Sequence, residues 1–84
     1  MANVRKGGYN LKYLVRFLQV NEIEYYFGND TETIILPVLG LYLYLNGDGT
    51  YMIYDGISGE YEYKPSCASL CHAIRRYDED DKYL

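Results

Sequence analysis

The stretch that decides the fold is LYLYLNGDGTYMIYD, residues 41–55. Each half alternates its bulky side chains with a period of two, which is the pattern of a strand with one buried face. Between the halves, Asn-Gly-Asp-Gly at 46–49 is a strong turn signal. The stretch therefore predicts a β-hairpin with strands over 41–45 and 50–54.

Two registers fit this hairpin. A type I turn followed by Gly49 in the left-handed conformation places Tyr51 and Ile53 on the same face as the leucines of the first strand. The outer face would then consist of Tyr42, Tyr44, Met52 and Tyr54. A two-residue turn at 47–48 would shift the pairing by one residue and exchange Met52 and Tyr54 with Tyr51 and Ile53. We favour the first register because glycine suits the left-handed position.

Helical spacing flanks the hairpin region on both sides. Asn10 is a good N-cap for a first helix that Asn21 can end. The apolar positions of this helix are Leu11, Leu14, Val15 and Leu18. Ser66 can cap a second helix. The apolar face of that second helix carries Cys67, Leu70, Cys71, Ile74 and Tyr77.

Extended patterns fill the rest of the middle of the chain, over residues 23–27, 31–36 and 60–63. In the last of these, Glu and Tyr alternate, and we interpret it as a half-buried strand with its tyrosines inward. The sequence therefore predicts an α+β fold in helix–strands–helix order. It consists of an antiparallel sheet of four to five strands with an N-terminal and a C-terminal helix packed on one face. Residues 1–84 form one domain, and residues 1–8 and 78–84 are expected to fray.

Tyrosine dominates the composition, with 12 of 84 residues, no Trp and two Phe. A ring with a polar tip suits half-buried positions and contact surfaces. The sequence contains no apolar run near the roughly 18 residues of a membrane span and no secretory signal pattern at its start. Its only two cysteines, Cys67 and Cys71, lie on one helical face, where a disulfide would distort the helix. Free thiols favour a cytoplasmic location, including the host cytoplasm if the protein is viral.

No recognisable chemistry emerges from the motifs. Structural zinc needs four ligands, and besides the two cysteines the chain offers only His72, which would point away from Cys71 on a helix. The same divergence disfavours a Cys–His catalytic pair. The glycine-containing turns at 46–49 and 56–59 match neither phosphate-binding fingerprint. We therefore predict no enzyme activity, no cofactor and no metal site.

The charges are unevenly distributed. Residues 21–63 carry eight acidic side chains and no basic one, whereas residues 1–20 carry four basic side chains and no acidic one. One interpretation is internal complementarity between basic helices and an acidic sheet. The other is a tyrosine-rich outer face bordered by Asp48, Asp55 and Glu62 that binds a basic protein partner through carboxylates and aromatic rings.

We therefore predict a non-enzymatic protein-binding module whose contact residues are Tyr42, Tyr44, Met52, Tyr54, Asp48, Asp55 and Glu62. One alternative is a self-associating structural or accessory subunit that dimerises through Tyr13, Phe17 and Val20. Another is a weak nucleic-acid binder that uses basic helix residues, which an acidic sheet disfavours because it repels phosphate. A thiol switch at Cys67 or Cys71 is a third.

In its small size, its lack of catalytic motifs and its acidic aromatic surface, the chain is similar in general character to phage-encoded inhibitors of the anti-CRISPR and anti-restriction type. The similarity is one of type and assigns no residue a role. It implies an inhibitor of a nucleic-acid-handling complex.

Overall fold

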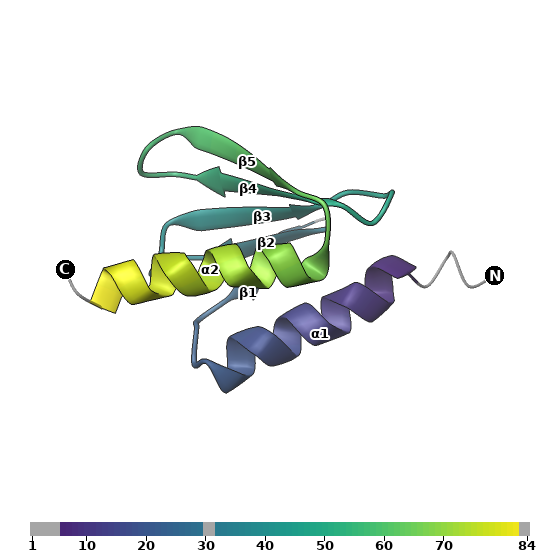
Figure 1. Cartoon of the computed structure of the whole chain (residues 1–84), viewed down its shortest axis with the longest axis horizontal. Coiled ribbons are helices and arrows are strands. Elements are labelled where there is room, and N and C mark those ends of the chain that lie inside the picture. The colour runs from purple at the N-terminus through teal and green to yellow at the C-terminus, as the bar shows by residue number, and fades with distance from the viewer. Residues whose placement is uncertain (1–5, 30–31, 83–84) are drawn as a thin grey trace.

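The computed structural model describes residues 6–29 and 32–82. Their elements follow in the order α1 (Lys6–Val20), β1 (Tyr26–Phe27), β2 (Thr33–Leu36), β3 (Leu41–Leu45), β4 (Tyr51–Asp55), β5 (Glu60–Lys64) and α2 (Cys67–Lys82) (Figure 1). This order confirms the predicted α+β class, with five strands between two helices. The strand expected over 23–27 is shorter than its pattern suggested, since only its last two residues pair.

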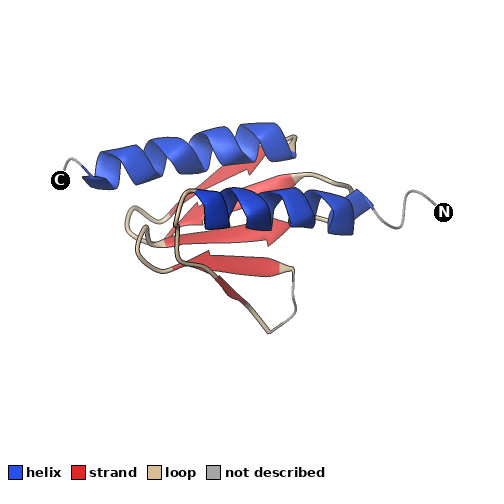
Figure 2. Ribbon diagram, turned by 90° about the horizontal axis from the view of Figure 1, so that it is seen from below, coloured by secondary structure: helices blue, strands red, loops and turns tan. Residues whose placement is uncertain are grey.

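The five strands form a single antiparallel sheet in which each strand pairs with the next one in sequence, in the order β1-β2-β3-β4-β5. Short turns connect the strands, and strands joined in this way pair antiparallel. Both helices lie side by side on one face of the sheet (Figures 1 and 2). Within residues 6–29 and 32–82, no helix lies on the opposite face (Figure 1).

The central hairpin of β3 and β4 adopts the favoured register. Leu43 lies opposite Ile53 and Leu45 opposite Tyr51. The turn is closed by the Gly49 N–H, which donates to Asn46 O at 3.2 Å, and Gly49 has a φ of 91°. Only glycine adopts that conformation at no steric cost. The left-handed glycine therefore fixes which side chains of the hairpin face the helices, and the two-residue turn is excluded.

The hydrophobic core fills the space between the helices and the inner face of the sheet. Both helices contribute a stripe of buried side chains at helical spacing, and the strands contribute alternate residues. The buried residues of the helices and the sheet are Leu14, Leu18, Leu70, Ala73, Ile74, Ile34, Leu36, Leu41, Leu43, Tyr51 and Ile53. The apolar face predicted for α2 is thus the face that packs on the sheet. In α1, Leu11, Leu14 and Leu18 pack there as predicted, but with Phe17 in place of Val15.

Helix α1 begins earlier than the sequence suggested, at Lys6 and not at an Asn10 cap. Of the residues 1–8 expected to fray, 6–8 are helical and 1–5 lie outside the described residues. The helix ends in a Schellman motif, in which Ile23 N donates to Leu18 O at 2.9 Å and Glu22 N donates to Gln19 O at 3.1 Å. Glu22 occupies the left-handed position of this motif with a φ of 56°.

A glutamate in that position stores strain, because the left-handed conformation costs a residue with a Cβ about 1–2 kcal/mol. We expect Glu22→Gly to raise the free energy of unfolding by about 0.5–1 kcal/mol, and so to raise the Tm by a few degrees. Urea and thermal denaturation measure both quantities. Val20→Gly is the matched control, since it changes an exposed helical residue nearby and should destabilise by about 0.5–1 kcal/mol. Destabilisation by Glu22→Gly would contradict the assigned strain.

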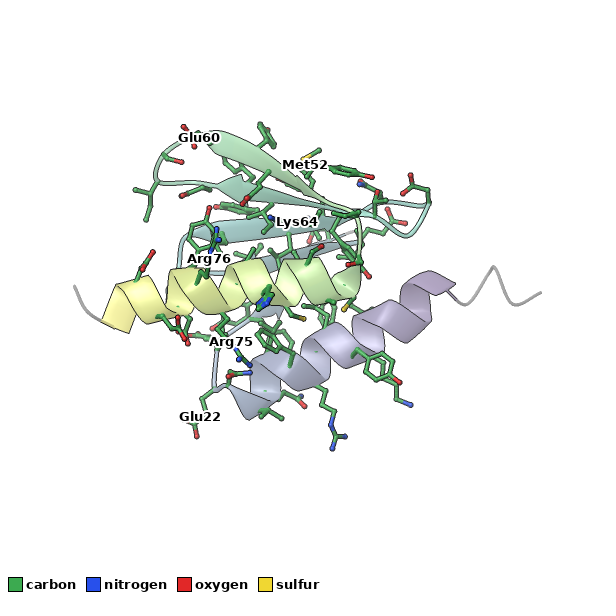
Figure 3. All side chains as sticks on the ribbon, in the orientation of Figure 1. Glu22, Met52, Glu60, Lys64, Arg75 and Arg76 are labelled. Carbon is green, nitrogen blue, oxygen red and sulfur yellow. The ribbon has the colours of Figure 1, made fainter. Side chains whose placement is uncertain are left out.

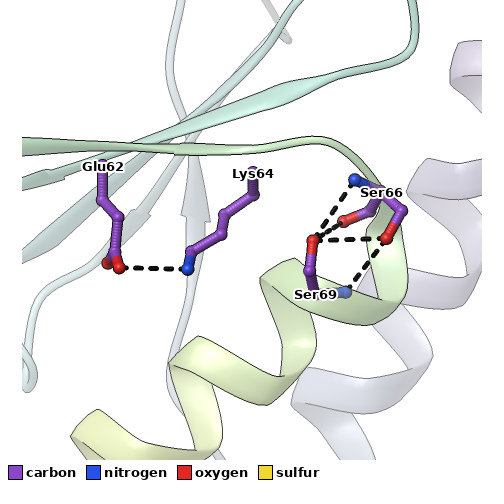
Figure 4. A network of polar contacts seen from close by, with 4 residues as sticks. All are labelled: Glu62, Lys64, Ser66 and Ser69. Carbon is purple, nitrogen blue, oxygen red and sulfur yellow. Dashed lines mark hydrogen bonds and ion pairs between the residues drawn. The ribbon is translucent and has the colours of Figure 1, made fainter.

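Helix α2 is capped at its start by the predicted Ser66. The Ser66 Oγ accepts a hydrogen bond from Ser69 N at 3.2 Å, and Ser66 N donates to the Ser69 Oγ at 3.3 Å (Figure 4). This exchange satisfies backbone donors at both positions, as in a capping box. The helix continues through the acidic segment 78–81 to Lys82, where fraying was expected. Within the described residues, neither helix is both long and apolar enough to cross a bilayer.

Candidate functional site

The sheet face turned away from the helices carries a block of aromatic side chains, which we call the outer face. Directly paired residues of neighbouring strands share a face, so the register assigns its members. They form two cross-strand rows, Tyr26, Ile35, Tyr42, Tyr54 and Tyr61 in one and Thr33, Tyr44, Met52 and Tyr63 in the other. Met52 points away from the helices (Figure 3). Six of the twelve tyrosines therefore gather on one surface.

Three of these rings form a contact row across β3, β4 and β5. The ring centroids of Tyr42 and Tyr54 are 5.8 Å apart, and those of Tyr54 and Tyr61 are 4.7 Å apart. Both separations fall in the range of favourable aromatic pairs. Gly56 gives the Tyr42 ring its space, because a Cβ at Gly56 would lie 3.3 Å from the ring carbon Cε1. Tyr54 is the central ring of the row.

The outer face is open to solvent over much of its area. Tyr61 is 66% exposed, Tyr63 56%, Tyr26 55% and Tyr42 37%. Inner-face residues of the three central strands, such as Ile34, Leu43 and Ile53, are fully buried, so these strands separate a dry face from an open one. An exposed group of large aromatic side chains is unusual on a protein surface that binds nothing. This surface is the candidate site, and it contains all four aromatic or thioether residues that the sequence predicted for it.

The interpretation of β5 was wrong in one respect. Tyr61 and Tyr63 lie opposite Tyr54 and Met52 and point outward, whereas Glu60 and Glu62 lie on the helix side. The alternation of Glu and Tyr predicts that the less polar residue, Tyr, faces the core. At an edge strand, however, the inner face reaches past the core, and the Glu62 carboxylate stays hydrated there while pairing with the Lys64 Nζ at 3.0 Å (Figure 4). The outer face is larger by two tyrosines as a result.

The acidic residues predicted to border the outer face are placed differently. Asp55 and Glu62 belong to the inner side of their strands by register. The Asp55 carboxylate accepts from Ile57 N at 2.9 Å and so shapes the β4–β5 turn. The pKa of Tyr77 in α2 is raised, first by its partial burial and then by the charges of Asp55, Glu62 and Glu60. These carboxylates thus face α2, and two of the three predicted acidic contacts do not border the outer face.

Asp48, the third predicted acidic contact, lies in the β3–β4 turn. Its Oδ1 accepts from the Thr50 hydroxyl at 2.6 Å and from Thr50 N at 3.0 Å. These two hydrogen bonds lower the pKa of the Asp48 carboxyl, the hydroxyl having the larger effect. Its first role is therefore to hold the turn that sets the register of the outer face.

A lowered pKa in the folded state contributes stability above the ordinary carboxyl pKa, and this contribution disappears as the pH falls through the folded value. We therefore expect wild type to be more stable than Asp48→Asn at pH 7. The difference should begin to shrink only below about pH 4, the ordinary carboxyl value, and should disappear as the pH falls through the lower folded value. Urea denaturation of both proteins over this pH range measures it. The comparison isolates Asp48, because every other carboxyl titrates in both proteins. A difference that stays constant with pH would contradict the assignment.

None of the nine outer-face side chains carries a formal charge. The nearest described carboxylate at the β1 end is that of Glu24, which accepts from the Tyr26 hydroxyl at 2.5 Å and is the main cause of the raised pKa of Tyr26. The face is therefore neutral and aromatic. Among the described acidic residues of this region, Asp48 lies in a turn, and Asp55, Glu60 and Glu62 lie on the helix side.

The residues predicted for self-association are not brought into one exposed patch. Tyr13 and Val20 are 56% and 71% exposed on α1. Phe17 packs partly against the core, and the Arg75 guanidinium lies 5.9 Å from its ring centre. Near Tyr13, a groove of about 730 Å³ runs between α1 and Phe27, and its lining includes the basic residues Lys12 and Arg16.

The two thiols lie half-buried on the core side of α2, where the sequence placed them. Burial raises the pKa of Cys71 to about 12, and the neighbouring Cys67 adds to this shift. Across residues 6–29 and 32–82, no three His, Cys, Asp or Glu side chains converge as metal ligands.

The fold and this surface define a small α+β protein with an open aromatic sheet face. Comparison with protein-family models, with curated proteins and with solved structures finds no match.

Proposed function

We propose that the chain is a non-enzymatic protein-binding module whose contact surface is the outer face. The observation that carries this proposal is the uncovered block of six tyrosines and Met52 on a regular sheet. Tyrosine and methionine are enriched at protein interfaces, where a ring provides contact area at a small cost in side-chain entropy. The sheet holds the rings in place before any partner arrives, which lowers the entropy lost on binding.

A protein partner fits this surface better than a nucleic acid does. Single strands stack their bases on aromatic platforms, but their affinity also requires Lys or Arg contacts to phosphate. None of the nine outer-face residues has a basic side chain, and neither does any other residue of 21–63. Described basic residues that could contact phosphate include Lys12 and Arg16 on α1 and Arg75 and Arg76 on α2, and both helices lie on the other side of the sheet (Figure 1).

The charge distribution favours a partner with a basic surface. Eight acidic residues within 21–63 give the sheet a negative field that attracts such a surface. At contact, tyrosine rings accept Arg and Lys side chains through cation–π interactions, and the hydroxyl groups accept their hydrogen bonds. Basic surfaces shaped for contact are common in nucleic-acid-handling complexes. The proposal thus extends to an inhibitor that occupies such a surface, as phage or mobile-element inhibitors of the anti-CRISPR and anti-restriction type do.

The two free thiols support a cytoplasmic site of action as part of this proposal, because thiols persist in reducing compartments.

Site-specific photo-crosslinking tests the proposal. A benzophenone-bearing phenylalanine replaces Tyr42 or Tyr61 in separate proteins, and a third protein carries it at Tyr13, an exposed tyrosine of α1. Illumination in cell extract, followed by mass spectrometry, should give crosslinks to one basic protein from positions 42 and 61 and not from 13. Crosslinks from position 13 alone would overturn the proposal, and would favour self-association through α1 if the captured chain were a second copy.

A further inference from the structure

Among the described strands, none pairs with the outer edge of β5, so one edge of the sheet is open. Strand β5 is the last strand of the sheet, and all five of its residues pair with β4 on the other side. Both helices lie over the inner face and not in the plane of the sheet, so they do not cap this edge (Figures 1 and 2). At the opposite edge, β1 is only two residues long. Natural sheets keep exposed edge strands short or otherwise protect them, because unpaired N–H and C=O groups recruit another strand.

We propose that two copies of the chain pair through β5 in antiparallel orientation, about a two-fold axis at Glu62, and so form a continuous ten-stranded sheet. In this register Glu60 lies opposite Lys64 of the second copy, and Tyr61 lies opposite Tyr63 of the second copy. All five residues of the strand take part. An axis at Tyr63 would place Tyr61 opposite Pro65, which has no N–H to donate.

Charge selects this register. The inner face of β5 reads Glu60, Glu62 and Lys64, so the axis at Glu62 creates two symmetric Glu–Lys pairs. The one unfavourable contact is between the two copies of Glu62, and each of these already has its own Lys64 Nζ at 3.0 Å. Charged side chains on an edge strand oppose pairing with an unmatched strand. Here the charges at the two ends of β5 are opposite to those they would meet in an antiparallel second copy.

A groove beside the edge fits the incoming carboxylate. It has a volume of about 460 Å³ and lies between β5 and the outward side of α2. Its charged lining consists of Lys64, Arg75 and Arg76 against Glu79, with His72 beside them. Arg75 and Arg76 leave α2 on opposite sides, with Arg76 toward the sheet (Figure 3). Since Glu60 of the second copy would arrive opposite Lys64, its carboxylate would lie beside this groove, near Lys64.

Pairing would also bury part of the outer face at its edge. Tyr61 and Tyr63 are 66% and 56% exposed. A cross-strand Tyr–Tyr pair on each side of the axis would cover the edge-facing side of each ring and leave its outer side accessible to a partner. The remaining outer-face rings of the two copies would form one surface of twice the width. The dimer stands independently of the proposed function, because it concerns the strand edge and is tested on the purified chain without a partner.

An introduced thiol tests the axis. In Glu62→Cys, the two thiols would lie on directly opposite residues, whose Cα atoms are about 4.5–5.5 Å apart, within the range of a disulfide. In the control Glu60→Cys, they would be displaced by four residues, or about 13 Å. Under mild oxidation we expect a disulfide-linked dimer from Glu62→Cys and not from Glu60→Cys or from wild type, whose two thiols are half-buried. Equal linkage from positions 60 and 62 would overturn the register.

Charge exchange tests the pairing without a covalent link. Lys64→Glu would place like charges opposite each other twice, and its weight-average mass in sedimentation equilibrium should shift toward monomer. The double variant Glu60→Lys/Lys64→Glu restores opposite charges and should recover the dimer. Circular dichroism checks that each variant is folded. A wild-type chain that remains monomeric into the millimolar range would overturn the proposal, whereas photo-crosslinking from Tyr42 would be unaffected.

Discussion

Tyr54→Ala is expected to weaken partner binding by about tenfold to a hundredfold while leaving the protein folded. Tyr54 is the central ring of the row on the outer face, with Tyr42 and Tyr61 at 5.8 Å and 4.7 Å. Central aromatic residues are the usual hot spots of an interface, where truncation costs about 2 kcal/mol or more. Each 1.4 kcal/mol corresponds to a tenfold change in Kd. Loss of the Tyr54 ring also removes the contact that holds the Tyr42 and Tyr61 rings in the orientation that binds the partner.

The affinity measurement uses the protein that photo-crosslinking identifies, titrated against each variant by calorimetry. Tyr54→Phe keeps the ring and removes only the hydroxyl, so it should lose less affinity than Tyr54→Ala. Tyr13→Ala is the surface control, because it removes an exposed tyrosine from α1. Equal affinities for wild type and Tyr54→Ala, with Tyr13→Ala weakened, would move the binding surface from the sheet to the helix.

The thiol of Cys71 is expected to react with iodoacetamide about thirtyfold to a hundredfold more slowly in the folded protein than in the unfolded chain. Burial raises the pKa of Cys71 to about 12, and Cys67 adds to the shift, while Arg75 lowers it. At neutral pH a three-unit rise leaves about a thousandfold less thiolate, which is the reacting form. Part of this loss is offset because a more basic thiolate is a stronger nucleophile.

Peptide mass spectrometry over a time course measures the alkylation of Cys71, with the same protein in urea as the reference. In the folded protein the rate should keep rising about tenfold for each pH unit above pH 8 and show no plateau near pH 9, because the thiolate remains a small minority. A rate equal to that in urea would mean that the thiol is accessible and ionises normally. The hypothesis of a thiol switch at this position would then regain support.

The sequence predicted the central hairpin and its register, with the second strand one residue early, because local chemistry determines the turn. Gly49 is suited to the left-handed position of one turn type, and that turn assigns every side chain of β3 and β4 to a face. The start and the apolar face of the second helix were equally predictable, since Ser66 and the apolar stripe of α2 are both local signals. Its length was not, because the acidic segment at 78–81 is a poor predictor of where a helix ends.

The orientation of β5 could not be obtained in the same way. An alternation of Glu and Tyr shows that the two kinds of residue lie on opposite faces, but it does not say which face meets the core. The pairing of β5 with β4 determines the face. The turn at 56–59 sets this pairing so that Tyr61 lies opposite the outward-facing Tyr54. The prediction that Asp55 and Glu62 border the outer face was wrong for the same reason. Both residues are near the tyrosines in sequence, but they lie on the other side of the sheet.

Because the outer face carries no charge, association with a partner and dissociation from it should depend on salt differently. Long-range attraction by the surrounding carboxylates acts while the molecules approach, and dissolved salt weakens it. Once the rings are covered, the lifetime of the complex depends on packed aromatic area that salt hardly affects. The protein would thus find its partner faster in dilute buffer yet release it at nearly the same rate in concentrated buffer.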